Sequence, residues 1–207
     1  TGDGVVDEDD KTIIGKAMPQ HTGGFTINGN WKAIDFSVGF TYQIGGDVYN
    51  ANAMHSLMGN KDNSAGQNRL KFVSETFKYY DVDANGDLML VKDPTALAAL
   101  NANTNYSSFF SEYGIVSSKF IEDASYLRLN TLTVGYTFPK NWMNKIGLQN
   151  ARVYFTGSNL FCIDGYSGID PDVNTKTDGK DGFPTPYFDY QSYPKARTYT
   201  FGVNLTF

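Results

Sequence analysis

The sequence predicts an all-β fold built from antiparallel strands, and two observations lead to it. Aromatic residues that favour strands are abundant, with 15 Phe and 14 Tyr among 207 residues, and they are combined with 21 Gly. That combination suits strands and tight turns better than helices. Five stretches also alternate between large apolar and small or polar side chains, which is the pattern of a strand with two chemically different faces.

The alternation is clearest in three stretches, and we take each as a strand. The first, 33–43, has its apolar side chains at Ile34, Phe36, Val38, Phe40 and Tyr42. The second, 126–138, has them at Leu132, Val134, Tyr136 and Phe138. The third, 198–207, has them at Tyr199, Phe201, Val203, Leu205 and Phe207. Two weaker stretches, 151–161 and 22–32, complete the five predicted strands.

The apolar faces of these strands could meet a second sheet or a lipid bilayer. Ordinary strands have about 5–6 residues, whereas a tilted strand needs about 9–11 to cross a bilayer. The predicted strands have ten to thirteen, and their other faces are rich in Thr, Ser, Asn and Gly, as a water-filled lumen would be. The pattern therefore favours a transmembrane β-barrel.

The lengths of the connections agree with a barrel in a bacterial outer membrane. With strands running alternately up and down, the short links near 32 and at 139–150 fall on one side. The longer segments 1–21, 44–125 and 162–197 fall on the other. Outer-membrane barrels have short periplasmic turns and long external loops. Because five strands are too few to close a barrel, we expect this chain to be a fragment of a larger one.

Several blocks, in order along the chain, carry a resemblance to a known family. They are Gly2–Gly15, Asp35–Phe40, Ile121–Pro139, Arg152–Phe161 with Tyr166–Asp172, and Tyr193–Phe207. Together they resemble the C-terminal part of SusC/RagA-family TonB-dependent outer-membrane transporters of Bacteroidetes. The resemblance implies that the chain forms the last five antiparallel strands of a 22-stranded barrel.

The family also implies a function and a set of partners. Its members import oligosaccharides or peptides together with a SusD-like surface lipoprotein, and they draw energy from TonB through an N-terminal part that is missing here. The partners implied are this SusD-like lipoprotein, TonB, the plug and other barrel strands of the same transporter, the lipid bilayer and the cargo. The expected location is the outer membrane, with extracellular loops and a periplasmic C-terminus.

The resulting organisation divides the chain into six segments. They are an extracellular acidic loop at 1–21, a barrel hairpin at 22–43, a long extracellular loop at 44–125, a barrel hairpin with a short periplasmic turn at 126–161, an extracellular loop at 162–197 and a C-terminal closing strand at 198–207.

One acidic stretch has the spacing of a calcium-binding loop. Asp81, Asp83 and Asn85 followed by a glycine and Asp87 match the opening of an EF-hand loop, where oxygen ligands at alternate positions surround the cation. The pattern then departs, because position 12 is Lys92 rather than glutamate. The alternative is a solvated acidic turn that joins two short external strands, such as 72–80 and 88–92.

A second acidic stretch lies near the N-terminus. Asp3, Asp7 and Asp10 match later positions of the same loop pattern, and its first ligand would precede Thr1. Calcium is the single cofactor that these two stretches indicate.

The loop 162–197 mixes aromatic and acidic side chains. Among them Tyr187, Asp189 and Tyr190 are candidate ligand contacts, because sugar rings stack on aromatic rings and sugar hydroxyls bind carboxylates. The alternative is a loop that folds on its own aromatic side chains or packs against a lid protein.

The composition argues against two other classes of function. With 17 basic and 22 acidic residues the net charge is −5, which disfavours nucleic acid as a partner. No nucleophile motif surrounds His55, Ser56 or Cys162, so we predict no enzyme activity. The competing prediction is a secreted all-β carbohydrate-binding module with calcium-stabilised loops.

Overall fold

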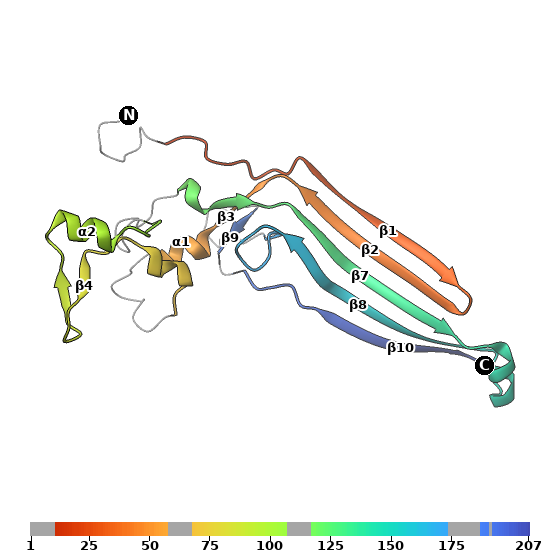
Figure 1. Ribbon diagram of the computed structural model, residues 1–207. Coiled ribbons are helices and arrows are strands. Elements are labelled where there is room, and N and C mark those ends of the chain that lie inside the picture. Colours follow the sequence, from red (N-terminus) through yellow and green to blue (C-terminus); the bar gives the residue numbers. More distant parts are fainter. Residues whose placement is uncertain (1–10, 58–67, 107–116, 174–186, 191) are drawn as a thin grey trace, which may run out of the picture. The chain divides into compact units, whose positions relative to one another are not determined.

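The computed structural model describes residues 11–57, 68–106, 117–173, 187–190 and 192–207 (Figure 1). The chain divides into two compact units, which we describe separately. The first contains residues 1–49 and 121–207, and the second contains residues 50–120. No helix among the described residues is long and apolar enough to span a membrane.

A five-stranded antiparallel sheet dominates the first unit. Its strands lie side by side in the order β1 (His21–Trp31), β2 (Ile34–Ile44), β7 (Tyr126–Thr137), β8 (Asn150–Asp164) and β10 (Thr198–Thr206) (Figure 1). Every neighbouring pair is antiparallel. The five predicted strands are therefore present, and most of their ends lie within one or two residues of the expected positions. The exception is β8, which continues to Asp164.

The large apolar side chains of this sheet share one face and stay largely exposed. In the strand register they form successive rows: Ile34, Tyr136, Val153 and Val203 in one, and Phe36, Val134, Phe155 and Phe201 in the next. Phe201 is 79% exposed and Leu205 is 50% exposed. A contiguous apolar surface of this kind marks a contact with lipid or with another protein.

Strand β7 contains a β-bulge that the sequence analysis missed. On the β2 side the pairing passes directly from Leu129 to Thr131, so Asn130 has no opposite residue. Leu129 and Leu132 consequently face the same side of the sheet, although they are three positions apart. If Asn130 were paired like its neighbours, Arg128 would share the apolar face with Leu132, because side chains alternate strictly along a regular strand.

The links at one end of the sheet are short. The turn from β1 to β2 places Lys32 in the left-handed region, at φ 56°. Between β7 and β8 the chain forms α3 (Lys140–Met143) and the 3₁₀ helix η4 (Asn144–Ile146). Gly147 ends η4 with φ 75°, a conformation that glycine adopts without strain. The expected short link is therefore partly helical.

A small second sheet lies beyond the other end of the long strands. It has the order β6 (Ile121–Asp123), β3 (Asp47–Asn50) and β9 (Phe188–Asp189). The backbone N–H of Tyr49 donates to the carbonyl of Tyr187 at 2.8 Å. Beside this sheet, Val48 and Ala124 are fully buried and form a hydrophobic cluster with Tyr166 and Val173.

The second unit is short helices and a hairpin. Its elements are α1 (Ala51–Leu57), η2 (Lys71–Glu75), β4 (Tyr80–Val82), β5 (Leu88–Leu90), α2 (Pro94–Leu100) and η3 (Ser118–Phe120). Asp93 caps α2 by accepting from the N–H of Ala96 at 2.8 Å. The strand suggested at 72–80 is wrong for most of its length, because η2 occupies its first part and β4 begins only at Tyr80.

Candidate functional site

The polar face of the large sheet gathers the charged and hydroxyl side chains of its strands. They are Asp35, Ser37, Thr41 and Gln43 on β2, Arg128, Thr131 and Thr133 on β7, Arg152, Tyr154 and Thr156 on β8, and Thr200 and Asn204 on β10. Some of these side chains bind one another across the strands, as the hydroxyls of Thr133 and Thr156 do at 3.0 Å. This face is the candidate functional surface.

An ion pair crosses three strands of this face. Arg152 donates from Nε to Oδ1 of Asp35 at 3.0 Å and from Nη2 to Oδ2 at 2.5 Å. Gly135 lies between the two residues, and a Cβ built there would be 2.6 Å from Cζ of Arg152. The absence of a side chain at Gly135 therefore opens the path by which the guanidinium reaches the carboxylate.

An aromatic ring lies beside this ion pair. The guanidinium carbon of Arg152 is 5.2 Å from the centre of the Tyr154 ring, within the range of a cation–π contact. Tyr154 is opposite Gly202, where a Cβ would come within 2.5 Å of the ring. Two glycines thus allow an arginine and a tyrosine to lie along the surface of the sheet, next to a carboxylate.

A second ion pair fixes the loop after β8 to β7. Nη2 of Arg128 donates to Oδ1 of Asp170 at 2.5 Å, and the two side chains are only 6% and 10% exposed. The same Oδ1 accepts the backbone N–H of Asp172 at 2.9 Å. Asp172 in turn pairs with Lys195, shortly before β10. The segment 170–172 is therefore bound both to a sheet strand and to the approach of the last strand.

Two tyrosines complete the buried polar network near the small sheet. The hydroxyl of Tyr187 donates to Oε1 of Gln43 at 2.9 Å, and the hydroxyl of Tyr166 donates to Oδ2 of Asp189 at 2.7 Å. Burial, and then the hydrogen bond to the Asp189 carboxylate, raises the pKa of Tyr166. Burial raises the pKa of Tyr187 as well. Both phenols therefore stay neutral hydrogen-bond donors at physiological pH.

The three candidate ligand contacts of this loop differ in their surroundings. Asp189 is 1% exposed, and its Oδ1 has no hydrogen-bond partner among the described residues. Tyr187 is half-buried against the hydrophobic cluster, whereas Tyr190 is 40% exposed. Tyr187 and Asp189 thus take part in the packing of the loop in this structure. Contact of Tyr187, Asp189 or Tyr190 with a ligand stays a prediction.

The acidic turn is organised by backbone donors. Oδ1 of Asp83 accepts the N–H of Asn85 at 2.8 Å and the N–H of Asp87 at 2.9 Å. These hydrogen bonds, chiefly the one from Asp87, lower the pKa of the Asp83 carboxyl. In the described part of the chain no three acidic, histidine or cysteine side chains are grouped as metal ligands. Asp3, Asp7 and Asp10 lie outside that part, and calcium binding at either stretch stays a prediction.

Comparison with known proteins gives clear relatives. No protein-family model matches the chain. TonB-dependent receptor P3 of Formosa agariphila is 30% identical over all 207 residues. TonB-dependent receptor SusC of Bacteroides thetaiotaomicron is 28% identical, again over the whole chain. The chain is a homologue of the SusC-type TonB-dependent receptors. This SusC-like chain spans 18% of the length of receptor P3 and 17% of that of SusC.

Solved structures show the same fold. The RagAB peptide importer in its closed-closed state matches with a TM-score of 0.61 and 21% identity. The match covers 99% of the present chain and 20% of the importer chain. The RagAB peptide transporter matches with a TM-score of 0.60 and 20% identity, over 92% of the present chain and 17% of the transporter chain. The fold expected from the sequence, antiparallel strands of a transporter barrel, is confirmed for the part of the barrel that this chain covers.

Proposed function

We propose that this chain forms part of the barrel wall of a TonB-dependent outer-membrane importer. The observation that carries the proposal is the division of the five-stranded sheet into an exposed apolar face and a polar face bearing the Asp35–Arg152 ion pair. A barrel wall needs both faces, because one meets hydrocarbon and the other meets a water-filled lumen. Among the described residues the outer strands β1 and β10 each have one partner strand, which leaves an edge for further strands of the same barrel.

The proposed orientation follows from the links. The turn at Lys32 and the link 138–149 join strands at one end of the sheet, which we assign to the periplasm. The longer segments 45–125 and 165–197 connect strands at the other end, which we assign to the cell exterior. The assignment follows the rule that periplasmic turns are short and external loops are long.

The proposed cargo is an oligosaccharide or a peptide, taken up with the help of a SusD-like surface lipoprotein and driven by TonB. The RagAB structures carry the description of a peptide importer, which supports the peptide option. Tyr154 beside Arg152 suits either cargo, because an aromatic ring packs on a sugar or a side chain while a guanidinium binds hydroxyl or carbonyl oxygens. The contribution of this chain is contact and shape, without catalysis.

The proposal also includes calcium at the acidic turn. Isothermal calorimetry on the receptor with calcium, before and after chelation, tests it. Sub-millimolar binding that is lost in Asp83→Asn supports the site, and the absence of heat at millimolar calcium refutes it.

Thiol labelling in the whole receptor tests the assignment of the two faces. Thr200 and Phe201 are neighbours on β10 that point to opposite sides. In a Cys162→Ser background, Thr200→Cys should react with a water-soluble maleimide in outer membranes. Phe201→Cys should react only after detergent is added. Equal reaction of both, in a protein that is soluble without detergent, would support the secreted binding module instead.

A further inference from the structure

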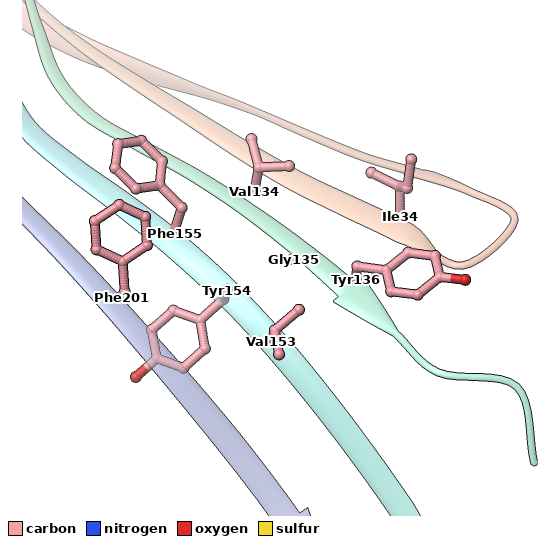
Figure 2. Close-up of a pocket in the computed structure, with 8 residues that line it drawn as sticks. All are labelled: Ile34, Val134, Gly135, Tyr136, Val153, Tyr154, Phe155 and Phe201. Atoms are coloured by element: carbon pink, nitrogen blue, oxygen red, sulfur yellow. The ribbon is translucent and has the colours of Figure 1, made fainter. Parts of the chain in front are cut away.

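The apolar face of the sheet carries a shallow groove. Its volume is about 310 Å³, and its lining comes from four adjacent strands (Figure 2). The lining residues are Ile34 on β2, Val134, Gly135 and Tyr136 on β7, Val153, Tyr154 and Phe155 on β8, and Phe201 on β10. An engineered apolar cavity of about 150 Å³ admits a benzene molecule, so this groove has room for a longer hydrocarbon segment.

The groove is the space between two rows of side chains. Ile34, Tyr136 and Val153 are paired in one row, and the next row along the strands contains Val134. Rings of Phe155 and Phe201 close that second row, with their centres 5.1 Å apart. Residues 135 and 154 belong to the polar face by alternation, so mainly backbone forms the floor between the rows.

One end of the groove is close in sequence to three cationic side chains. Lys32 lies two residues before Ile34, and Lys140 and Lys145 lie in the link that follows Tyr136. All three lysines are exposed, and neither link contains an aspartate or glutamate. The nearest carboxylate in β2, that of Asp35, is on the opposite face and is paired with Arg152. This end of the sheet therefore offers positive charge to an anion.

The two tryptophans of the chain lie at these links, Trp31 as the last residue of β1 and Trp142 within α3. Trp31 is 64% exposed, Trp142 is 59% exposed, and Lys32 has its Nζ 4.9 Å from the centre of the Trp31 ring. Exposed tryptophan together with lysine is the composition found at the level of lipid headgroups, where the indole ring spans the boundary between hydrocarbon and water. An apolar groove that ends at such a group matches the chemistry of one lipid molecule.

We propose that the groove is a binding site for one glycerophospholipid. An acyl chain lies between the two rows, and the phosphate of the headgroup is held by Lys140, Lys145 and Lys32. The proposal rests on the proposed membrane wall and deepens it, because it assigns a single lipid to a defined place on that wall. Its occupant is a phosphate-bearing lipid rather than a protein, since the groove is apolar while its charged end is cationic.

The test uses the whole receptor, purified in detergent and titrated with phosphatidylglycerol under native mass spectrometry. Val134→Trp fills the groove and should weaken retention of the lipid about tenfold, the effect of about 1.4 kcal/mol. Val203→Trp is the matched control, because Val203 lies on the same apolar face, is 62% exposed and does not line the groove. The double variant Lys140→Gln/Lys145→Gln should weaken retention while leaving the packing of the sheet unchanged.

The outcomes separate the lipid site from the proposed function. Loss of lipid in Val134→Trp and in the lysine variant, with retention in Val203→Trp, supports the site. Equal retention in all variants, or no retained lipid in the unaltered receptor, overturns it. Thiol labelling at positions 200 and 201 is measured in parallel. If Thr200→Cys reacts and Phe201→Cys is protected but no lipid is retained, only the proposed lipid site is refuted. If both cysteines react equally, the proposed membrane wall is refuted as well.

Discussion

Arg152 on β8 binds Asp35 on β2 across the whole width of β7. The two residues are 117 positions apart in the sequence, and both oxygens of the carboxylate accept from the same guanidinium. A bidentate pair of this kind fixes the direction of both side chains. It therefore determines which groups the polar face presents beside Tyr154, and it depends on the glycine between them.

The first prediction concerns that glycine. Gly135→Ala places a methyl group against Arg152, so the guanidinium must move and the pair with Asp35 opens. We expect a loss of about 1–3 kcal/mol, the usual range for overpacking. Gly39→Ala is the control, because its nearest neighbour would be at 3.6 Å. The measurement is the temperature at which the receptor unfolds in detergent, and equal shifts in both variants would contradict the prediction.

The second prediction concerns the two faces. Phe201→Arg puts a charge on the apolar face and should destabilise the membrane-inserted protein by up to about 2–4 kcal/mol. Thr200→Arg puts the same charge on the polar face and should be tolerated. Outer-membrane levels of the two variants, compared by immunoblot, check this. If Thr200→Arg is the more damaging of the two, the faces have been assigned the wrong way round.

The third prediction concerns the bulge in β7. Deletion of Asn130 removes the unopposed residue, so Arg128 stays on the polar face and Leu129 stays on the face of Leu132. We therefore expect the receptor still to assemble in the outer membrane. Deletion of Ser37 in β2, a strand with no extra residue against β1, turns over the remainder of that strand and should abolish assembly. Outer-membrane levels of the two variants check this, and loss of assembly without Asn130 alone would show that the bulge itself is required.

The fourth prediction compares two aspartates of the same loop. Asp170→Ala leaves the buried Arg128 without its carboxylate and should cost about 3–5 kcal/mol. Asp172→Ala removes a pair with Lys195 in which both partners are about 40% exposed, and should cost about 0–1 kcal/mol. Limited proteolysis of the intact receptor reports the difference as faster cleavage within 162–197 for the first variant. Similar cleavage rates would mean that Arg128 does not anchor the loop.

The fifth prediction concerns the acidic turn and pH. The pKa of Asp83 is lowered because the N–H groups of Asp87 and Asn85 donate to its carboxylate. The ionised form therefore stabilises the turn at any pH above the ordinary value of 3.8, and this stabilisation disappears as the pH falls through the lowered value. NMR signals of the two amides should move together below pH 3.8 and not above it. The variant Asp83→Asn should remove the transition.

The sequence predicted the large sheet well and the rest of the chain less well, for physical reasons. The two faces of strand β2 can be assigned from the alternation within the strand alone, without knowing which strands pair with it. The pairing of Arg128 with Asp170 depends on a contact over 42 positions, and no local pattern indicates it. Asn130 is an ordinary strand residue in composition, so only the change of phase from Leu129 to Leu132 could have indicated the bulge.

The calcium pattern and the ligand loop show a second limit. A spacing such as that of Asp81, Asp83 and Asn85 specifies which atoms could meet, but the same residues also form an ordinary turn, since aspartate accepts from the backbone two positions on. In the same way the charge of Asp189 indicates a ligand contact, and the structure buries this carboxylate beside Tyr166. Composition indicates available chemistry, and packing decides which of it is exposed.

The strict two-residue period of the strands has a consequence for how such genes can change. An insertion or deletion of a single codon within β2 or β10 would exchange the membrane side for the lumen side along the remainder of that strand. A change of any length in 45–125 or 165–197 leaves the faces untouched. The comparison with SusC extends over 214 positions, more than the 207 residues of this chain, and we expect the additional positions to fall in those connections. Differences in length can therefore accumulate in these connections, while the two faces of the strands stay unchanged.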